Sequence, residues 1–149
     1  MFSHRYRYLF IALLALYTFM NTALCNVYYY FNIDIEWYYA LATIFFVWEG
    51  NRLLKPSLKR KFFTPDKKIR FLSLFFIAGN VIAFISSVAV VYFIGNVLHG
   101  YTWAQSSNPF KLNIIYGSLI NRFFHLLNAI LFFFREYRRH WAEVEELRR

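Results

Sequence analysis

Four apolar blocks, each long enough to cross a lipid bilayer, constrain this sequence more than any other feature. They cover about residues 8–28, 36–54, 71–98 and 112–134. A helix needs about 20 such residues to cross a hydrocarbon core of roughly 30 Å. A water-soluble bundle would instead show narrow apolar stripes alternating with charged faces. We therefore predict an all-α integral membrane protein, a bundle of four transmembrane helices over 1–134, followed by a helical linker over 135–149.

Basic residues gather beside the apolar blocks and set the expected orientation. The chain has a formal charge of +9, with Lys and Arg concentrated near Arg5, within 55–70 and within 135–149. Cytoplasmic segments of membrane proteins carry such an excess, which also attracts anionic lipid headgroups. We expect both termini in the cytoplasm and lipid headgroups at the loop 55–70. No DNA- or RNA-recognition motif is present, so nucleic acid is not an expected partner.

The first block is open to two interpretations. Its apolar core, 9–20, is as short as the central region of a signal peptide, and 22–25 resembles a lipoprotein cleavage site. However, the bulky Leu24 stands where a small residue is required before cleavage. We therefore expect a retained first helix. Cys25 is the only cysteine, which excludes a disulfide within one chain.

Two connections are predicted from helix-breaking residues. Pro56 is expected to end the second helix at Leu54, and Pro56 and Pro65 to keep 55–70 irregular. The polar, nearly uncharged stretch 99–111 contains Gly100 and Pro109 and is predicted to form the outer loop.

Glu49 and Arg52 are charges placed inside an apolar block. At about 1.5 Å per residue, Glu49 lies roughly 9 Å inside the cytoplasmic boundary expected at Lys55. Arg52 can extend its long side chain to the headgroups, whereas Glu49 points deeper into the bilayer. Two interpretations remain: a structural ion pair between the two, or a functional acid that contacts another helix.

A polar stripe follows the fourth block. Asn113, Gly117, Asn121, His125 and Asn128 recur at intervals of four, four, four and three residues. Such a stripe cannot face lipid, so it must face the bundle or a partner. It favours a polar packing network over a ligand cavity, because hydrogen bonds between helices are common in membranes.

This stripe and the second helix together form the candidate site. At matching depth, a contact between Glu49 and His125 is predicted. Arg122 lies beside the stripe, nearer the midplane, where a direct bond to Glu49 is less favoured. The candidate intramembrane network is Glu49, Arg52, Asn121, Arg122, His125 and Asn128. In the third block, Gly79, Ala83 and Ser87 form a small-residue stripe that lets a neighbouring helix approach.

The tail after the fourth block is charged but keeps an apolar seam. Oppositely charged side chains stand four residues apart, as in Arg139/Glu143. Tyr137, Trp141 and Val144 continue the spacing of a heptad seam from the membrane helix. We expect this seam to transmit motion and to pair with a second copy of the chain.

Catalysis has little support in the sequence. The four histidines are dispersed, with no HxxxH or HExxH pair for a metal. There is no glycine-rich phosphate loop, and Ser86 and Ser87 have no evident base. We expect no enzyme activity, no metal and no cofactor.

Two segments resemble a known family. The stretch 128–147, with the aromatic run before Arg135, Trp141 and Glu143-Val144-Glu145-Glu146-Leu147, resembles the last membrane helix and exit linker of LytS-type (LytTR-associated) bacterial sensor histidine kinases. Glu49-Gly50-Asn51-Arg52 is similar to the Glu-x-Asn-Arg late in the second helix of that family. The resemblance implies a multi-pass protein of the bacterial cytoplasmic membrane. The family's phosphoacceptor segment and ATP-binding domain would follow Leu147, and the sequence given ends at Arg149.

These observations predict a membrane input module of a two-component signalling system, without kinase activity of its own. It would act as a dimer, on a downstream kinase domain or partner protein, through a packing change carried by the fourth helix. The alternative is a standalone membrane effector or a transporter- or channel-like protein that uses the polar face of that helix. An intramembrane enzyme built on Glu49 and His125 is a third, weaker interpretation.

Overall fold

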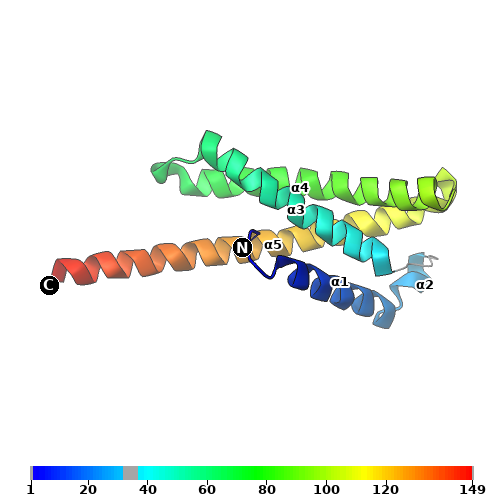
Figure 1. Ribbon diagram of the computed structural model, residues 1–149, viewed down its shortest axis with the longest axis horizontal. Coiled ribbons are helices and arrows are strands. Elements are labelled where there is room, and N and C mark those ends of the chain that lie inside the picture. Colours follow the sequence, from blue (N-terminus) through cyan, green and yellow to red (C-terminus); the bar gives the residue numbers. More distant parts are fainter. Residues whose placement is uncertain (1, 32–36, 149) are drawn as a thin grey trace.

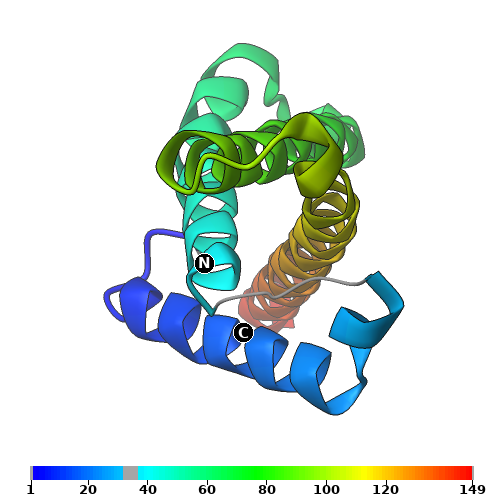
Figure 2. The same ribbon diagram turned by 90° about the vertical axis from the view of Figure 1, so that its right-hand side faces the viewer.

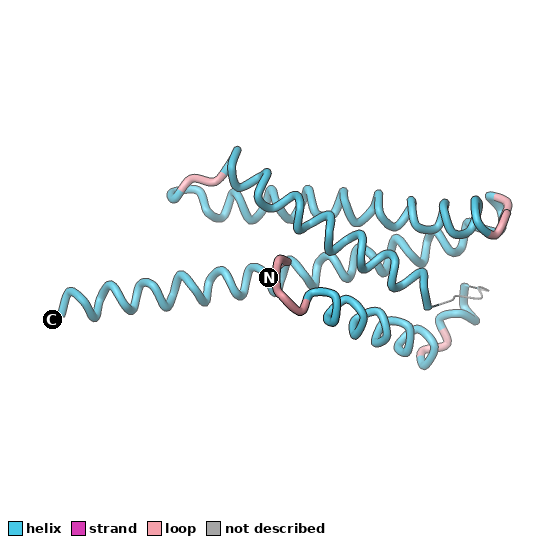
Figure 3. Tube along the Cα trace, in the orientation of Figure 1, coloured by secondary structure: helices cyan, strands magenta, loops and turns pink. Residues whose placement is uncertain are grey.

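The computed structural model describes residues 2–31 and 37–148, and over these residues the chain is helical without any strand. Figures 1 and 3 show long helices joined by short connections. The elements are α1 (Arg7–Leu24), α2 (Val27–Phe31), α3 (Trp37–Phe62), the 3₁₀ turn η1 (Pro65–Lys67), α4 (Lys68–Val91), the π-helical η2 (Tyr92–Leu98) and α5 (Trp103–Arg148).

Three of the described helical stretches are long and apolar enough to cross a membrane. They are α1, the continuous stretch Pro65–Leu98 around α4, and α5. The predicted second span, in α3, falls outside this set. Its second half contains Glu49, Asn51 and Arg52, which lower its mean hydropathy.

The helices pack as a three-helix group with a fourth helix on one side. α3, α4 and α5 contact one another, while α1 packs chiefly against α3, and α2 touches α5. The end-on view shows α1 lying across the side of the group rather than inserted between the others (Figure 2). The C-terminal part of α5 projects beyond the other helices (Figure 1).

Large apolar side chains from α3, α4 and α5 form the core, with the N-terminal segment folded into it. Phe2 is only 2% exposed. Its ring meets those of Trp48, Phe75 and Phe124 edge-on. The Trp48 indole N–H donates a hydrogen bond of 2.9 Å to the Phe2 carbonyl oxygen. This insertion has no counterpart in the sequence predictions, because a single Phe before the first apolar block carries no periodicity.

The predicted loop 55–70 is largely helical. α3 passes through Pro56 and ends at Phe62. A proline removes one helical hydrogen bond, and the Leu, Lys and Arg residues that follow favour helix. The break comes instead at Pro65, where the extended conformation that a proline favours in the residue before it is adopted. Thr64 accordingly has extended backbone angles of φ −126° and ψ 144°.

The predicted outer loop 99–111 is also shorter than expected. α5 begins at Trp103 and includes Pro109, leaving a connection that contains Gly100 at φ +69°. Thr102 and Gln105 form a capping box: the Gln105 side-chain oxygen accepts a bond of 2.8 Å from the Thr102 backbone N–H. This Thr-x-x-Gln pattern is visible in the sequence and marks the helix start.

The first predicted helix, 8–28, is two helices in the structure. α1 ends at Leu24, and α2 starts at Val27. Between them Asn26 has φ +50°, a left-handed conformation that ends a helix and that Asn tolerates. At the other end of the chain, α5 continues without a break to Arg148.

Candidate functional site

A buried polar cluster links the middle of α3 to α5. Asn51 of α3 donates through its side-chain amide to the Asn121 side-chain oxygen at 2.9 Å and to the Val47 carbonyl oxygen at 2.8 Å. The Asn51 oxygen lies 3.0 Å from His125 Nε2. Asn51 and Asn121 are completely buried, and His125 is 6% exposed. Burying polar side chains so deep in a bundle is costly unless they are paired. This cluster pairs them between helices, except for the Asn121 amide nitrogen, which has no hydrogen-bond partner among the described residues.

α4 completes this cluster with a glycine rather than a polar group. A Cβ added to Gly79 would overlap His125 Nε2 and crowd the Asn51 side-chain oxygen. The rings of Phe75 and Phe76 surround the imidazole edge-on, at centroid distances of 4.4 and 5.6 Å. The small-residue stripe of α4 therefore makes room for the histidine of α5.

A second polar layer lies closer to the N-terminal end of α3. Thr43 of α3 and Asn113 of α5 are joined by two hydrogen bonds of 3.0 and 2.9 Å. The Asn113 amide also donates to the Ser87 carbonyl oxygen of α4 at 2.9 Å. Gly117 faces Ser87, whose hydroxyl would be overlapped by a Cβ at that glycine. As in the first layer, a glycine allows two helices to approach beside an asparagine.

A third contact lies at the cytoplasmic end expected from the sequence. Lys55 Nζ donates to the Asn128 side-chain oxygen at 2.7 Å. The polar stripe of α5 thus contacts α3 at three levels, through Asn113, Asn121 and Asn128.

Glu49 lies outside this network, and the predicted contact with His125 is wrong. Its carboxylate contacts Arg52 at 2.5 Å and Arg7 of α1 at 3.2 Å, the latter without the alignment of a hydrogen bond. Residues two apart on a helix are about 200° apart around its axis. Because Asn51 faces α5, Glu49 must face away from it, toward α1. The missed partner of His125 is therefore Asn51.

The other predicted residues lie outside the bundle interior. Arg122 is exposed and makes none of the contacts of the network. In the tail, Tyr137 and Trp141 are 60% and 53% exposed, and their rings touch edge-on. Val144 is half-buried on the same helix. Within the described residues, no three His, Cys, Asp or Glu side chains cluster as metal ligands do.

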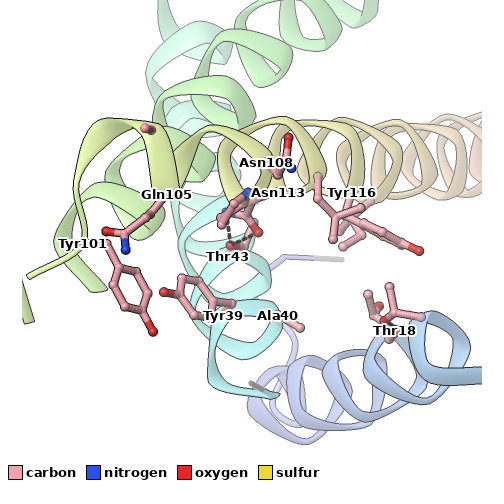
Figure 4. A pocket seen from close by; sticks show the side chains of 14 residues that line it. Thr18, Tyr39, Ala40, Thr43, Tyr101, Gln105, Asn108, Asn113 and Tyr116 are labelled. Atoms are coloured by element: carbon pink, nitrogen blue, oxygen red, sulfur yellow. Dashed lines mark hydrogen bonds between the residues drawn. The ribbon is translucent and has the colours of Figure 1, made fainter. Parts of the chain in front are cut away.

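A cavity of about 450 Å³ opens between α1, α3 and α5. Figure 4 shows Tyr39 and Tyr101 at one end, Thr18 of α1 across from Tyr116 of α5, and the Thr43–Asn113 pair on the wall. No sequence pattern predicted this cavity, because its lining comes from three helices and the connection before α5, which share no common motif. The lining residues are Thr18, Thr22, Tyr39, Ala40, Thr43, Tyr101, Ala104, Gln105, Asn108, Pro109, Leu112, Asn113, Tyr116 and Ile120.

These features define a helical protein with membrane-length helices and a polar seam inside the bundle, made by Asn51, Asn121 and His125. It also has a cavity whose described lining residues are uncharged. Comparison with protein-family models, with curated proteins and with solved structures found no match for the chain.

Proposed function

We propose that the chain is a membrane input module of a signalling protein, with α3 as the fourth membrane crossing and both ends in the cytoplasm. The observation that carries this proposal is the single helix α5, 46 residues long. It lines the cavity, holds the polar seam and then projects beyond the bundle (Figure 1). A rigid helix of this kind moves at both ends when its packing changes at one.

The charge distribution supports the proposed orientation. The last turn of α3 carries Lys59, Arg60 and Lys61, and Lys67 and Lys68 follow across the turn. This helical hairpin end places the basic cluster on the same side as the projecting tail (Figure 1). Anionic headgroups of a bacterial cytoplasmic membrane are its proposed partner.

The polar seam supplies the two-state element that a switch needs. Asn51, Asn121 and His125 have several donors and acceptors, so the seam can exchange one set of hydrogen bonds for another. Hydrogen bonds between membrane helices contribute only about 0.6 kcal/mol on average. Two arrangements of the seam would therefore differ by little, as required for a ligand to shift their populations.

The tail is the proposed output. Its exposed aromatic pair, Tyr137 and Trp141, is placed for contact with a second copy or with a downstream kinase domain. Rotation or displacement of α5 would change the register of this contact.

Cross-linking tests the output. In a Cys25→Ser background, Trp141→Cys should form a disulfide-linked dimer in membranes. Arg138→Cys, which lies outside the apolar seam of the tail, should not. Adding Asn51→Leu should change the yield at position 141, whereas Leu126→Ala, which alters a lipid-facing neighbour of His125, should leave it unchanged. Equal cross-linking at positions 138 and 141, or no effect of Asn51→Leu, contradicts the proposal.

The transporter-like alternative has less support. At the inner end the interior is filled by Phe2, Trp48 and Phe124, whose rings pack against one another. A polar pathway along α5 would have to displace them. Solute or ion flux in liposomes carrying the purified protein is the measurement that would favour this alternative.

A further inference from the structure

The cavity is polar on every helix that lines it, including α1, the least buried of the three helical stretches long and apolar enough to cross a membrane. The buried face of α1 changes along its length, from Ile11 and Ala15, which pack in the core, to Thr18 and Thr22, which line the cavity. α1 packs against α3 but makes no comparable contact with α5 among the described residues. The cavity therefore lies where α1 and α5 separate, and polar side chains occupy both walls.

The lining offers both donors and acceptors. The Thr18 hydroxyl donates to the Leu14 carbonyl oxygen at 2.8 Å, and that of Thr22 donates to the Thr18 carbonyl oxygen. Each threonine thus presents an oxygen that can accept a further bond. The Asn108 amide donates to the Phe31 carbonyl oxygen at 2.9 Å, which leaves its side-chain oxygen as an acceptor.

Gln105 supplies the complementary group. Its side-chain oxygen accepts both bonds from Thr102, at 2.8 and 3.0 Å, so its amide nitrogen is the group available as a donor. The hydroxyl of Tyr101, at the mouth, can donate or accept. A ligand that fits this set must both donate and accept hydrogen bonds, which is the property of a hydroxyl group.

The lining carries no Asp, Glu, Lys, Arg or His among the described residues. A charged ligand taken from water into such a site would lose hydration without gaining an opposite charge. The tyrosine rings and Leu112, Ile120 and Pro109 instead offer apolar surface for the faces of a ring. At about 30 Å³ per water molecule, the cavity holds the volume of roughly 15 waters, which is enough for a small ring compound with its hydroxyls.

We propose that this cavity binds an uncharged, hydroxyl-rich ring ligand of monosaccharide size. The ligand enters at the mouth formed by Tyr101, Gln105 and Asn108, whose side chains are exposed. Two sources supply this chemistry: a free sugar or cyclitol in the outer solution, and the sugar headgroup of a neutral glycolipid in the surrounding bilayer. The inference names the ligand class of the proposed input module, and binding can be measured without any signalling output.

Cysteine protection in nanodiscs tests the cavity and its ligand class together. In a Cys25→Ser background, Thr18→Cys should react with N-ethylmaleimide at least tenfold faster than Ile11→Cys, which sits in the core at the same helix. The experiment has a soluble arm and a lipid arm. In the soluble arm, at least one saturating neutral compound should slow the Thr18→Cys reaction at least fivefold; the compounds are methyl glucoside, methyl galactoside, methyl mannoside and inositol. In the lipid arm, glucosyl-dioleoylglycerol is included in the nanodisc as the ligand.

Charged rings of the same size are the matched controls. Glucuronate and glucosamine should protect Thr18→Cys less than one-fifth as well as the best neutral compound. Tyr101→Ala should weaken protection about fivefold, as loss of one hydrogen bond and a ring face implies, while Tyr30→Ala, also at an exposed tyrosine but outside the cavity, should not.

Three results overturn the inference: Thr18→Cys reacting no faster than Ile11→Cys, protection by neither the soluble nor the lipid arm, or equal protection by the charged rings. Protection without any change in Trp141→Cys cross-linking would retain the cavity ligand and refute the input module. If Asn51→Leu changes the cross-linking but no compound protects Thr18→Cys, the input module is retained and the cavity ligand is refuted.

Discussion

Gly79 and His125 should be energetically coupled across the α4–α5 contact. Gly79→Ala adds a methyl group that overlaps His125 Nε2 and crowds the Asn51 side-chain oxygen. Overpacking of this kind costs about 1–3 kcal/mol, while replacing a helical Gly by Ala regains about 0.5–1 kcal/mol. The net expectation is a loss of between about 0 and about 2.5 kcal/mol in the free energy of unfolding.

The double variant separates this steric cause from a general effect of the substitution. His125→Ala removes a hydrogen bond worth about 0.6–1.7 kcal/mol between membrane helices and also removes the ring that the new methyl group would strike. The loss in Gly79→Ala/His125→Ala should therefore be at least about 1 kcal/mol smaller than the sum of the two single losses. Gly79→Ala combined with Leu126→Ala, at an exposed position, should be additive.

The assay is equilibrium unfolding in mixed micelles, followed by tryptophan fluorescence. It is applied to each double-mutant cycle, which compares the unmodified protein, the two single variants and the double variant. Additivity of Gly79→Ala and His125→Ala within about 0.5 kcal/mol would refute the claim that the glycine exists to accommodate the imidazole.

Three further changes test other parts of the fold. Phe2→Ala should destabilise the inner end by up to about 3–5 kcal/mol and shift tryptophan emission to the red; unchanged emission would mean that the N-terminal segment is not inserted. Thr43→Val removes both bonds to Asn113 and should cost about 1–3 kcal/mol in the same unfolding assay, whereas a neutral effect would show that another partner replaces them. In the tail beyond the predicted membrane segment, the Lys68 ammonium holds the pKa of Glu136 below its ordinary value, so their contact stabilises the fold at neutral pH and is lost as pH falls through that pKa. Lys68→Met should return the pKa of Glu136 toward its ordinary value in a carbon-detected NMR titration, and an unmoved pKa would contradict the pairing.

The apolar blocks and the polar stripe predicted much of the helical arrangement, because both depend on local periodicity. The positions of Asn113, Asn121, His125 and Asn128 on one face follow from 3.6 residues per turn, and the structure places the stripe against α3 and α4. Which side chain of α3 meets His125 could not be read in the same way. The contact between Glu49 and His125 was predicted because both residues lie at a similar depth along the bilayer. The direction in which a side chain points around the axis of α3 decides the contact, and Asn51 is the residue that points toward His125.

The two prolines show a related limit of local rules. Pro56 and Pro65 look equivalent in the sequence, yet α3 passes through the first and stops before the second. The difference lies in the residues around them, since good helix formers on both sides of Pro56 can sustain a helix with one bond missing. The insertion of Phe2 and the cavity are features of the tertiary structure. They depend on where several helices meet, so no pattern within one short segment predicts them.

In the proposed input module, α3 would connect the cavity with the tail, because it contacts α1 and α5 through different faces. Toward α1 it presents Glu49, paired with Arg7 at the start of that helix. Toward α5 it presents Asn51, bonded to Asn121.

A ligand that draws the Thr18 side of α1 toward α5 would pivot α1 about its contact with α3 and pull on the Arg7–Glu49 pair. The charges near Glu49, which leave α3 outside the set of helices apolar enough to cross a membrane, are therefore placed where motion of α1 would reach the polar seam. Glu49→Gln, which keeps the size of the side chain but removes its charge, should reduce any ligand-induced change in Trp141→Cys cross-linking while leaving ligand protection of Thr18→Cys intact. Loss of both together would instead place Glu49 in the folding of the cavity itself.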